Sequence, residues 1–361
     1  MDVEIYREKV IEFVDSVIRP NLATWEESGS YPLELHALAA KENILSLGQN
    51  PDDEFHDDLA CRKVLIEELS RSGSQAMVMA LASHFVSLNA FKTTLPETYT
   101  RLCKQIFSGK KTLVLALTEP QAGSDLKSIQ CEASLEAGGE YLLSGEKTFI
   151  CNGNRADYML TAARLDKKLT LFLVKADKNS ITSTAIPCLG WQGLPIASIK
   201  FNRVKATRVG EPGQAGRLLQ QILLQERLSL AVMANTSAMV TFEAALEYSK
   251  RRKVQGSPLF EQQIIRHRLA DMHGKIELCR AYINQYIAAV TVSGPDAKAI
   301  AIAKNQAVEI LEEVAAKSVQ IHGASGCISG SQAERIYRDA RLLGLGGGST
   351  EVMNEMISRL L

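Results

Sequence analysis

The chain has 361 residues, of which 46% are hydrophobic and 23% are charged, shares that are close to those of an ordinary soluble globular protein. They exclude wholesale disorder, collagen and a small disulfide-rich scaffold. The 41 basic and 41 acidic side chains give a formal net charge of zero, so nothing in the overall charge favours binding to nucleic acid. No apolar run approaches the ~18 residues of a membrane span. Seven cysteines without a C-x-x-C pair favour reduced thiols and a cytoplasmic location.

Residues 1–110 are predicted to form an N-terminal helical domain. Apolar residues recur at helical spacing from Ile5 to Ile18, and Pro20 ends the run. The other helical stretches expected here are residues 59–70, 76–91 and 100–107.

Residues 111–212 are predicted to form a middle β domain with an antiparallel sheet. Short β-branched and apolar runs alternate there with turn-forming residues such as Gly, Asn, Asp and Ser. The runs include residues 112–117, 141–144, 148–151, 169–174 and 199–204.

Residues 213–361 are predicted to form a C-terminal helical bundle. Long helices with short connections are typical of antiparallel bundles. The expected helices are residues 217–252, 264–292, 296–322 and 331–343, followed by a glycine-rich turn at 344–348 and a last helix. The sequence therefore predicts an α+β protein with the order helical, β, helical.

Two segments of the β domain could hold a cofactor. Residues 117–125 leave a strand and turn at Pro120 and Gly123, offering hydroxyls and backbone N–H groups that can surround a phosphate. An ordinary Pro–Gly turn is the alternative. Phe149 lies shortly before an Asn–Gly turn and could stack on a planar ring; a core position is the alternative.

One acidic residue interrupts an apolar helix face. Glu226 lies three residues after Leu223 and four before Leu230, within the stripe of the helix predicted at 217–252. Burial of a carboxylate raises its pKa, which suits a general base. The alternative is a structural ion pair with Arg227 or another cation. Further along, residues 346–348 are glycines that allow a ligand to approach the backbone, just before a helix that begins near Ser349.

These segments occur in the order and spacing of the acyl-CoA dehydrogenase flavoprotein family, which the chain resembles over nearly its whole length. The motifs that carry the resemblance are residues 118–125 (TEPQAGSD), 147–150 (KTFI), 248–252 (YSKRR), 320–323 (QIHG) and 337–341 (YRDAR). The resemblance implies a four-helix bundle in the C-terminal part, FAD as cofactor, a homo-oligomer (dimer or tetramer) with FAD at the subunit interface, and electron-transfer flavoprotein as the electron acceptor.

The resemblance also assigns roles to individual residues. Leu117 and Thr118 resemble contacts to the flavin edge, Gly123 and Ser124 resemble contacts to the pyrophosphate, and Phe149 resembles the aromatic residue packed on the isoalloxazine. The residues that look like contacts to the FAD of the neighbouring subunit are Arg252, Gln263, Gln320 and Gly323. Ser349 and Glu351 occupy positions that in relatives are usually Thr and Gln or Glu and lie near the flavin or its phosphates.

Two departures from the family pattern bear on catalysis. Cys151 stands where most members have a Thr or Ser that bonds the flavin, and a thiol is a weak donor. Gly347 stands where most members have the catalytic Glu, although it can still supply a backbone N–H. The isovaleryl-CoA, long-chain acyl-CoA and prolyl-carrier-protein dehydrogenases place the base on the long helix directly before an Arg, and that position is Glu226 here.

The resemblance thus implies α,β-dehydrogenation of an acyl-CoA thioester, with Glu226 taking the α-proton and FAD accepting hydride. Three alternatives stay open: the same oxidation of an acyl or aminoacyl group on a carrier protein, a flavin oxidase or monooxygenase on this fold, and a non-catalytic protein that binds FAD.

Overall fold

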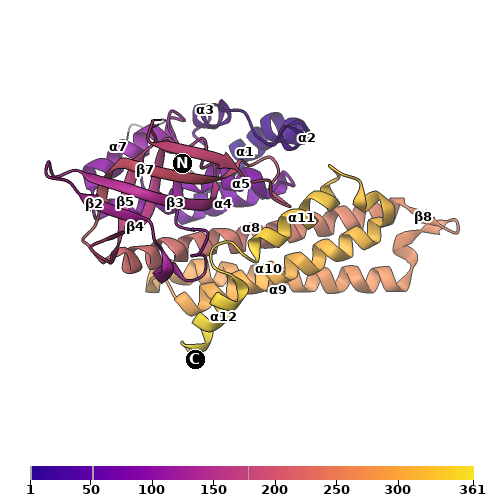
Figure 1. The fold of residues 1–361 in the computed structure, drawn as a ribbon. Helices are drawn as coiled ribbons and strands as arrows, with labels where there is room; N and C mark the ends of the chain where they lie inside the picture. Colours follow the sequence, from indigo (N-terminus) through magenta and orange to yellow (C-terminus); the bar gives the residue numbers. More distant parts are fainter. Residues whose placement is uncertain (1, 51–52, 178) are drawn as a thin grey trace.

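The computed structural model describes residues 2–50, 53–177 and 179–361, which form N-terminal helices, a middle sheet and long C-terminal helices (Figure 1). The predicted domain boundaries fall in the connections between α7 and β1 and between β7 and α8.

The N-terminal part is helical up to Phe107. Asp2 and Asp58 begin two of its helices by accepting backbone N–H groups of the first turn, as N-cap residues do. The stretch expected at 76–91 forms two helices because the chain turns at Ser83. The helices are α1 (Val3–Phe13), α2 (Leu22–Glu27), α3 (Leu35–Lys41), α4 (Leu59–Arg71), α5 (Gln75–Ala82), α6 (His84–Lys92) and α7 (Pro96–Phe107).

The middle part is a seven-stranded sheet in which pairings close a ring through β4, β2, β3, β7 and β5. Most pairs are antiparallel, as predicted, but β1 runs parallel to β4, and β2 meets β4 in one parallel bridge. The strands are β1 (Leu113–Ala116), β2 (Glu132–Leu135), β3 (Tyr141–Cys151), β4 (Tyr158–Leu165), β5 (Lys168–Lys175), β6 (Ile181–Ala185) and β7 (Ile196–Val209).

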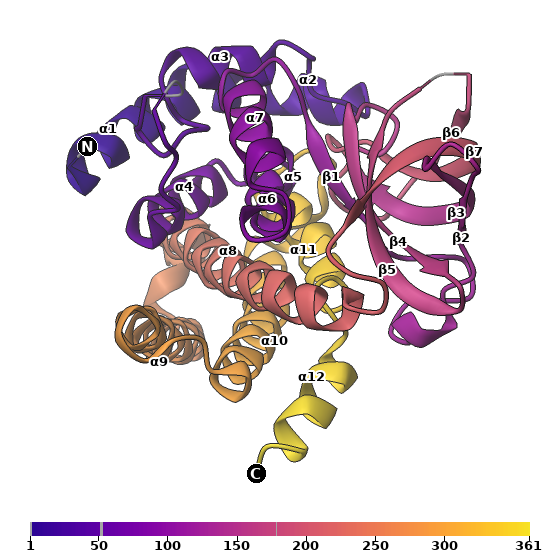
Figure 2. The same ribbon diagram turned by 90° about the vertical axis from the view of Figure 1, so that its left-hand side faces the viewer.

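The C-terminal part is built around α8, which packs on α4 and α6 on one side and on α9 and α10 on the other (Figure 2). By length and mean hydropathy α8 could cross a membrane, but 78% of its most apolar window is buried, so here it is a core helix. A hairpin of β8 (Lys253–Val254) and β9 (Ser257–Pro258) joins α8 to α9. The helices are α8 (Ala215–Arg251), α9 (Gln263–Ser293), α10 (Ala297–His322), α11 (Gln332–Leu343) and α12 (Thr350–Ser358).

Candidate functional site

The loop after β1 is fastened to β3 by a buried ion pair. Lys147 of β3 is fully buried, and its Nζ donates to Glu119 Oε1 at 2.6 Å and to Leu117 O at 3.0 Å. Beside it, Thr148 N donates to Thr118 O at 2.8 Å. The start of the predicted phosphate loop and the strand that carries Phe149 therefore form one rigid unit.

The Glu119 carboxylate organises the rest of this loop. It accepts hydrogen bonds from Gln121 Nε2 (2.6 Å), Gln130 N (2.6 Å) and Cys131 N (3.1 Å). Burial acts to raise the pKa of Glu119, but the bond from Gln130 N and the contact with Lys147 outweigh it, so this pKa lies below its ordinary value. Glu119 is thus a charged centre about which the loop folds.

The far side of the loop offers unused donors. The backbone N–H groups of Gly123 and Ser124 have no hydrogen-bond acceptor among the residues that the structure describes. A Cβ at Gly123 would meet no atom within 4 Å, so the loop is open on that side. Convergent N–H groups of this kind suit an anion such as a pyrophosphate.

Phe149 is held outside the core by an irregularity in β3. The register between β3 and β7 shifts between Lys147 and Ile150, and Phe149 has φ 55°. Its side chain is 60% exposed, whereas those of Thr148 and Ile150 are buried. Phe149 is therefore not a core residue. An exposed ring on a rigid strand, next to a loop with free N–H groups, fits the flavin that the sequence predicts.

The end of β3 meets α8. Cys151 is half-buried, and burial raises the pKa of its thiol to about 12, helped by the negative charge of Glu226 and by Cys188. Glu226 thus acts electrostatically on the last residue of the strand that carries Phe149. The predicted base is therefore within electrostatic range of one predicted flavin contact, Cys151.

Glu226 lies between the buried residues Leu219 and Leu230 on α8 and is itself half-buried. Burial raises its pKa, while Arg227 and Lys304 act to lower it. Among the described residues, no nitrogen of a cationic side chain lies within 4.0 Å of its carboxylate. The ion pair with Arg227 that the sequence left open is not formed, because that guanidinium donates to Gly347 O at 3.0 Å.

The glycine turn at 344–348 is held by two cations. Arg227 Nε donates to Gly347 O, and Lys304 Nζ donates to Gly348 O at 2.9 Å. Gly347 has φ 66°, and a Cβ there would lie 2.5 Å from Leu230 Cδ1. Its backbone N–H has no acceptor within the described part of the chain. The turn thus presents a fixed, free N–H beside α8.

Ser349 and Glu351 follow this turn at the start of α12. The Ser349 hydroxyl accepts the N–H of Val352 at 3.4 Å and caps the helix. The Glu351 side chain is exposed. Both residues are near Gly347 in the chain, and among the described residues neither forms a hydrogen bond or ion pair with the loop at 117–125.

The remaining predicted cofactor residues form a second group. Arg252 follows α8, Gln263 begins α9, Gln320 lies in the last turn of α10 and Gly323 follows it. All four are exposed, and the adjoining hairpin β8–β9 lies at the end of the bundle opposite the sheet (Figure 1). The structure does not bring this group to the loop and Phe149 of the same chain.

Sequence reasoning missed two buried lysines. Lys304 lies between Ile300 and Val308 on the buried face of α10 and has no exposed surface. The test that selected Glu226, a charge within an apolar helical stripe, would have found it. Lys147 gives a weaker signal, because a strand lysine is ordinarily solvated.

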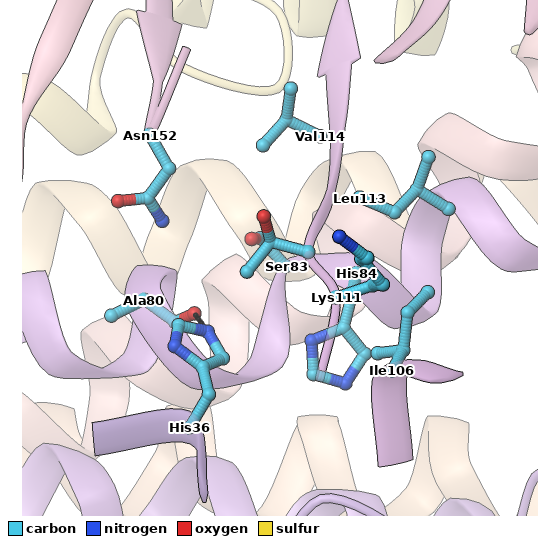
Figure 3. A pocket seen from close by; sticks show the side chains of 10 residues that line it. His36, Ala80, Ser83, His84, Ile106, Lys111, Leu113, Val114 and Asn152 are labelled. Carbon is cyan, nitrogen blue, oxygen red and sulfur yellow. Dashed lines mark hydrogen bonds between the residues drawn. The ribbon is translucent and has the colours of Figure 1, made fainter. Parts of the chain in front are cut away.

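Two cavities lie away from these residues. The smaller, of about 10 Å³, has room for about one water molecule and is bounded by His36 and His84 (Figure 3). Burial lowers the pKa of His36 to about 4 and that of His84 to about 3. The larger, of about 700 Å³, is an open groove on the sheet with Arg101 and Arg208 among its lining residues. None of the predicted site residues lines either cavity.

Comparison with known proteins adds independent information. The acyl-CoA dehydrogenase middle domain matches residues 114–204, and the acyl-CoA dehydrogenase C-terminal domain matches residues 215–361. The mitochondrial long-chain specific acyl-CoA dehydrogenase of Sus scrofa is 28% identical over 368 residues, which cover 99% of this chain and 85% of that protein. The caffeyl-CoA reductase–Etf complex subunit CarC of Acetobacterium woodii is 29% identical and covers 93% of this chain and 91% of its own length.

A solved structure of a probable acyl-CoA dehydrogenase from Mycobacterium abscessus matches with a TM-score of 0.92 and 31% identity, covering 99% of this chain and 98% of that one. Butyryl-CoA dehydrogenase from Megasphaera elsdenii matches with a TM-score of 0.91 and 25% identity, covering 100% of this chain and 98% of that one. Both domain matches and both kinds of relative agree with the resemblance found in the sequence. The chain belongs to the acyl-CoA dehydrogenase family, whose members are FAD-dependent oxidoreductases that act on CH–CH bonds.

Proposed function

We propose that the protein oxidises an acyl-CoA thioester across its α,β carbon–carbon bond, with Glu226 as the base that takes the α-proton. The observation that carries this proposal is the setting of Glu226. The residue is half-buried, it acts electrostatically on Cys151 at the end of β3, its pKa is raised by burial, and no cation of the described residues is paired with it within 4.0 Å. A carboxylate with few waters and no fixed partner is well suited to accept a proton.

The residues that would hold FAD in this subunit are Leu117, Thr118, Gly123, Ser124, Phe149, Cys151, Ser349 and Glu351. When bound, FAD supplies the acceptor for the hydride that leaves the β-carbon. The free N–H groups of Gly123 and Ser124 would face the pyrophosphate, and the exposed ring of Phe149 would pack on the flavin. With FAD held by these residues, the substrate bond would react between the flavin and Glu226.

Removal of an α-proton leaves negative charge on the thioester oxygen, which the site must stabilise. Gly347 offers a backbone N–H without an acceptor among the described residues. Arg227 donates to Gly347 O and Lys304 donates to Gly348 O, so the backbone of the turn is held in place on both α8 and α10. We assign Gly347 N–H to the thioester oxygen for this reason.

We also propose that the protein is a cytoplasmic homo-oligomer, a dimer or a tetramer. Arg252, Gln263, Gln320 and Gly323 lie at the far end of the bundle, where they could reach only the FAD of another subunit. On α9, Ile264 is 60% exposed, an apolar side chain that a subunit contact would cover. Light scattering of the flavin-loaded protein should therefore show more than one chain per particle.

Electron-transfer flavoprotein is the proposed acceptor of the electrons. The support comes from the A. woodii relative, whose name places it in a complex with Etf. We favour CoA thioesters over carrier-protein thioesters as substrates, because the names of the two relatives compared above refer to acyl-CoA and caffeyl-CoA. Rapid oxidation of the reduced flavin by air would instead indicate an oxidase or a monooxygenase.

The test compares Glu226→Gln with Glu243→Gln, a matched change on the exposed part of the same helix. Each protein is loaded with FAD and mixed anaerobically with a panel of acyl-CoA thioesters, and flavin bleaching is followed by stopped flow. Loss of the base should slow bleaching by about 10²–10⁴-fold in Glu226→Gln, with FAD content unchanged. Glu243→Gln should bleach at the wild-type rate. Equal rates in both variants would refute the assignment of Glu226.

A further inference from the structure

Lys304 is a fully buried charge in the N-terminal third of α10. Its side chain has no exposed surface, and its Nζ donates to Gly348 O at 2.9 Å, the one hydrogen bond it makes to the described residues. An ammonium group carries three N–H donors, and its burial is unfavourable unless nearby groups compensate the charge. A lysine in this place needs a negative partner.

The charges around Lys304 come from three helices. Burial lowers its pKa to about 8, and Arg227 of α8 acts in the same direction. Three carboxylates act against this: Glu226 of α8, Glu312 of α10 and Glu351 of α12. Glu226 is the largest of the three contributions, and the effect is mutual, because Lys304 acts to lower the pKa of Glu226.

We propose that Lys304 is a positioning residue, which holds the glycine turn through Gly348 O and keeps the neighbouring Glu226 carboxylate ionised and ready to accept the substrate proton. This inference rests on the proposed function of Glu226 as the base. Lys304 itself touches neither substrate nor cofactor in this assignment.

The physical reason is the conflict that burial creates at Glu226. Burial increases the basicity of a carboxylate, but it also favours the protonated form, which cannot take a proton. A cation that is near without forming a direct ion pair resolves this conflict, because it stabilises the charge and leaves both oxygens free. Lys304 meets the condition, since its Nζ is farther than 4.0 Å from the Glu226 oxygens and is bonded to Gly348 O instead.

Arg227 also acts on Glu226, and Glu226 in turn acts on Cys151. Arg227 is bonded to Gly347 O, and the Cys151 thiol stays neutral because its pKa is about 12. Lys304 lies on a different helix from Glu226. Replacing it therefore changes the pKa of Glu226 without breaking the hydrogen bond from Arg227 of α8 to Gly347 O.

The test uses Lys304→Gln, which removes the charge but keeps a donor for Gly348 O, and Lys304→Met, which removes both. Lys317→Met is the control, because Lys317 lies on the same helix and pairs with Asp271 and Glu313. Anaerobic flavin reduction by an acyl-CoA is measured from pH 5.5 to 9.5. The acid limb of the rate should move up by about one pH unit in both Lys304 variants, and not in the control. A purely structural role would lower the rate without moving the limb.

The outcomes separate this inference from the proposal on which it rests. If Glu226→Gln abolishes flavin reduction but the acid limb stays in place in Lys304→Gln, the role of Lys304 is wrong and that of Glu226 stands. If Glu226→Gln reduces its flavin normally, the base assignment itself is wrong. Should neither Lys304 variant fold, Glu226→Gln is added to each: recovery of folding demonstrates the coupling, and continued failure overturns it.

Discussion

Replacement of Lys147 by methionine tests whether the buried ion pair holds the loop after β1. The change removes the ammonium but keeps the length of the side chain, and it leaves Glu119 as a carboxylate that is only 3% exposed. Removal of one partner of a buried pair costs about 3–5 kcal/mol, because the other charge is left without compensation. The Glu119 carboxylate still accepts hydrogen bonds from three N–H groups, so we expect a cost at the lower end of this range, about 3 kcal/mol.

The magnitude can be checked by thermal unfolding of the FAD-loaded protein. At about 2.1 cal/mol/K per residue, unfolding of 361 residues carries an entropy of about 0.8 kcal/mol/K, so 3 kcal/mol corresponds to a fall in Tm of about 4 °C. The chain offers a matched control, since Lys205 pairs with Glu140 at 2.8 Å while both side chains are more than half exposed. Lys205→Met should cost less than about 1 kcal/mol.

A second consequence concerns the cofactor. Lys147 also donates to Leu117 O, so its loss should loosen the loop and lower the affinity for FAD, measured by titration of the flavin-free protein. Lys147→Met combined with Glu119→Gln should be less destabilised than Lys147→Met alone, because no unpaired charge remains. The reasoning would be refuted if Lys147→Met and Lys205→Met lowered Tm equally.

Two other predictions concern buried groups near the glycine turn and α11. Burial raises the pKa of Asp339 from 3.8 to about 7, so the folded protein keeps a proton that the unfolded chain loses, and stability should fall as pH rises from about 4 to about 7. This pH dependence is worth at most about 4 kcal/mol. Asp339→Asn should abolish it, which Tm measurements at pH 5 and pH 7.5 can check. If the difference in Tm between the two pH values were the same in Asp339→Asn and in the wild type, the raised pKa would be contradicted. Gly347→Ala should cost about 1–2 kcal/mol, because φ is 66° and the new Cβ would lie 2.5 Å from Leu230 Cδ1. Leu230→Ala removes the clash but leaves a core cavity, so the two changes together should lower Tm by less than the sum of their separate effects.

The long helices could be predicted closely from the sequence. The expected ranges 217–252, 264–292 and 296–322 correspond to α8 (Ala215–Arg251), α9 (Gln263–Ser293) and α10 (Ala297–His322). Their apolar periodicity extends over many turns, and residues such as Gly294 and Asp296 end or cap them. Over such lengths the local signal agrees with the tertiary structure.

The strands were harder to predict because their bounds depend on neighbours. The runs at 141–144 and 148–151 form one strand, since Gly145 adopts φ 142° and passes Cys131 where a Cβ would lie 2.8 Å from its Cα. The residues of β4 are not among the predicted runs, and this strand pairs with β1, β2 and β5. The sequence of a single strand carries little information about such partners.

For the site, the sequence selected residues but not their mutual arrangement. Glu226 followed from helix phase together with the family resemblance, and Phe149 from its place before a turn together with the same resemblance. Two relations depend on how α8, α10 and β3 pack. The charge of Glu226 acts on Cys151, and Lys304 donates a hydrogen bond to Gly348 O in the glycine turn. No periodicity within one element contains those relations.

The glycine turn and the base position are linked by one packing constraint. Leu230 lies one turn after Glu226 on α8, and its side chain occupies the space that a Cβ at position 347 would need. With φ 66° as well, the turn could carry a glutamate only if both its backbone and Leu230 moved. The turn can nevertheless supply a backbone N–H, because a glycine there leaves that group unhindered and Arg227 fixes the adjoining carbonyl. We therefore infer that α8 provides the carboxylate that takes the proton, while the turn provides the N–H donor for the thioester oxygen.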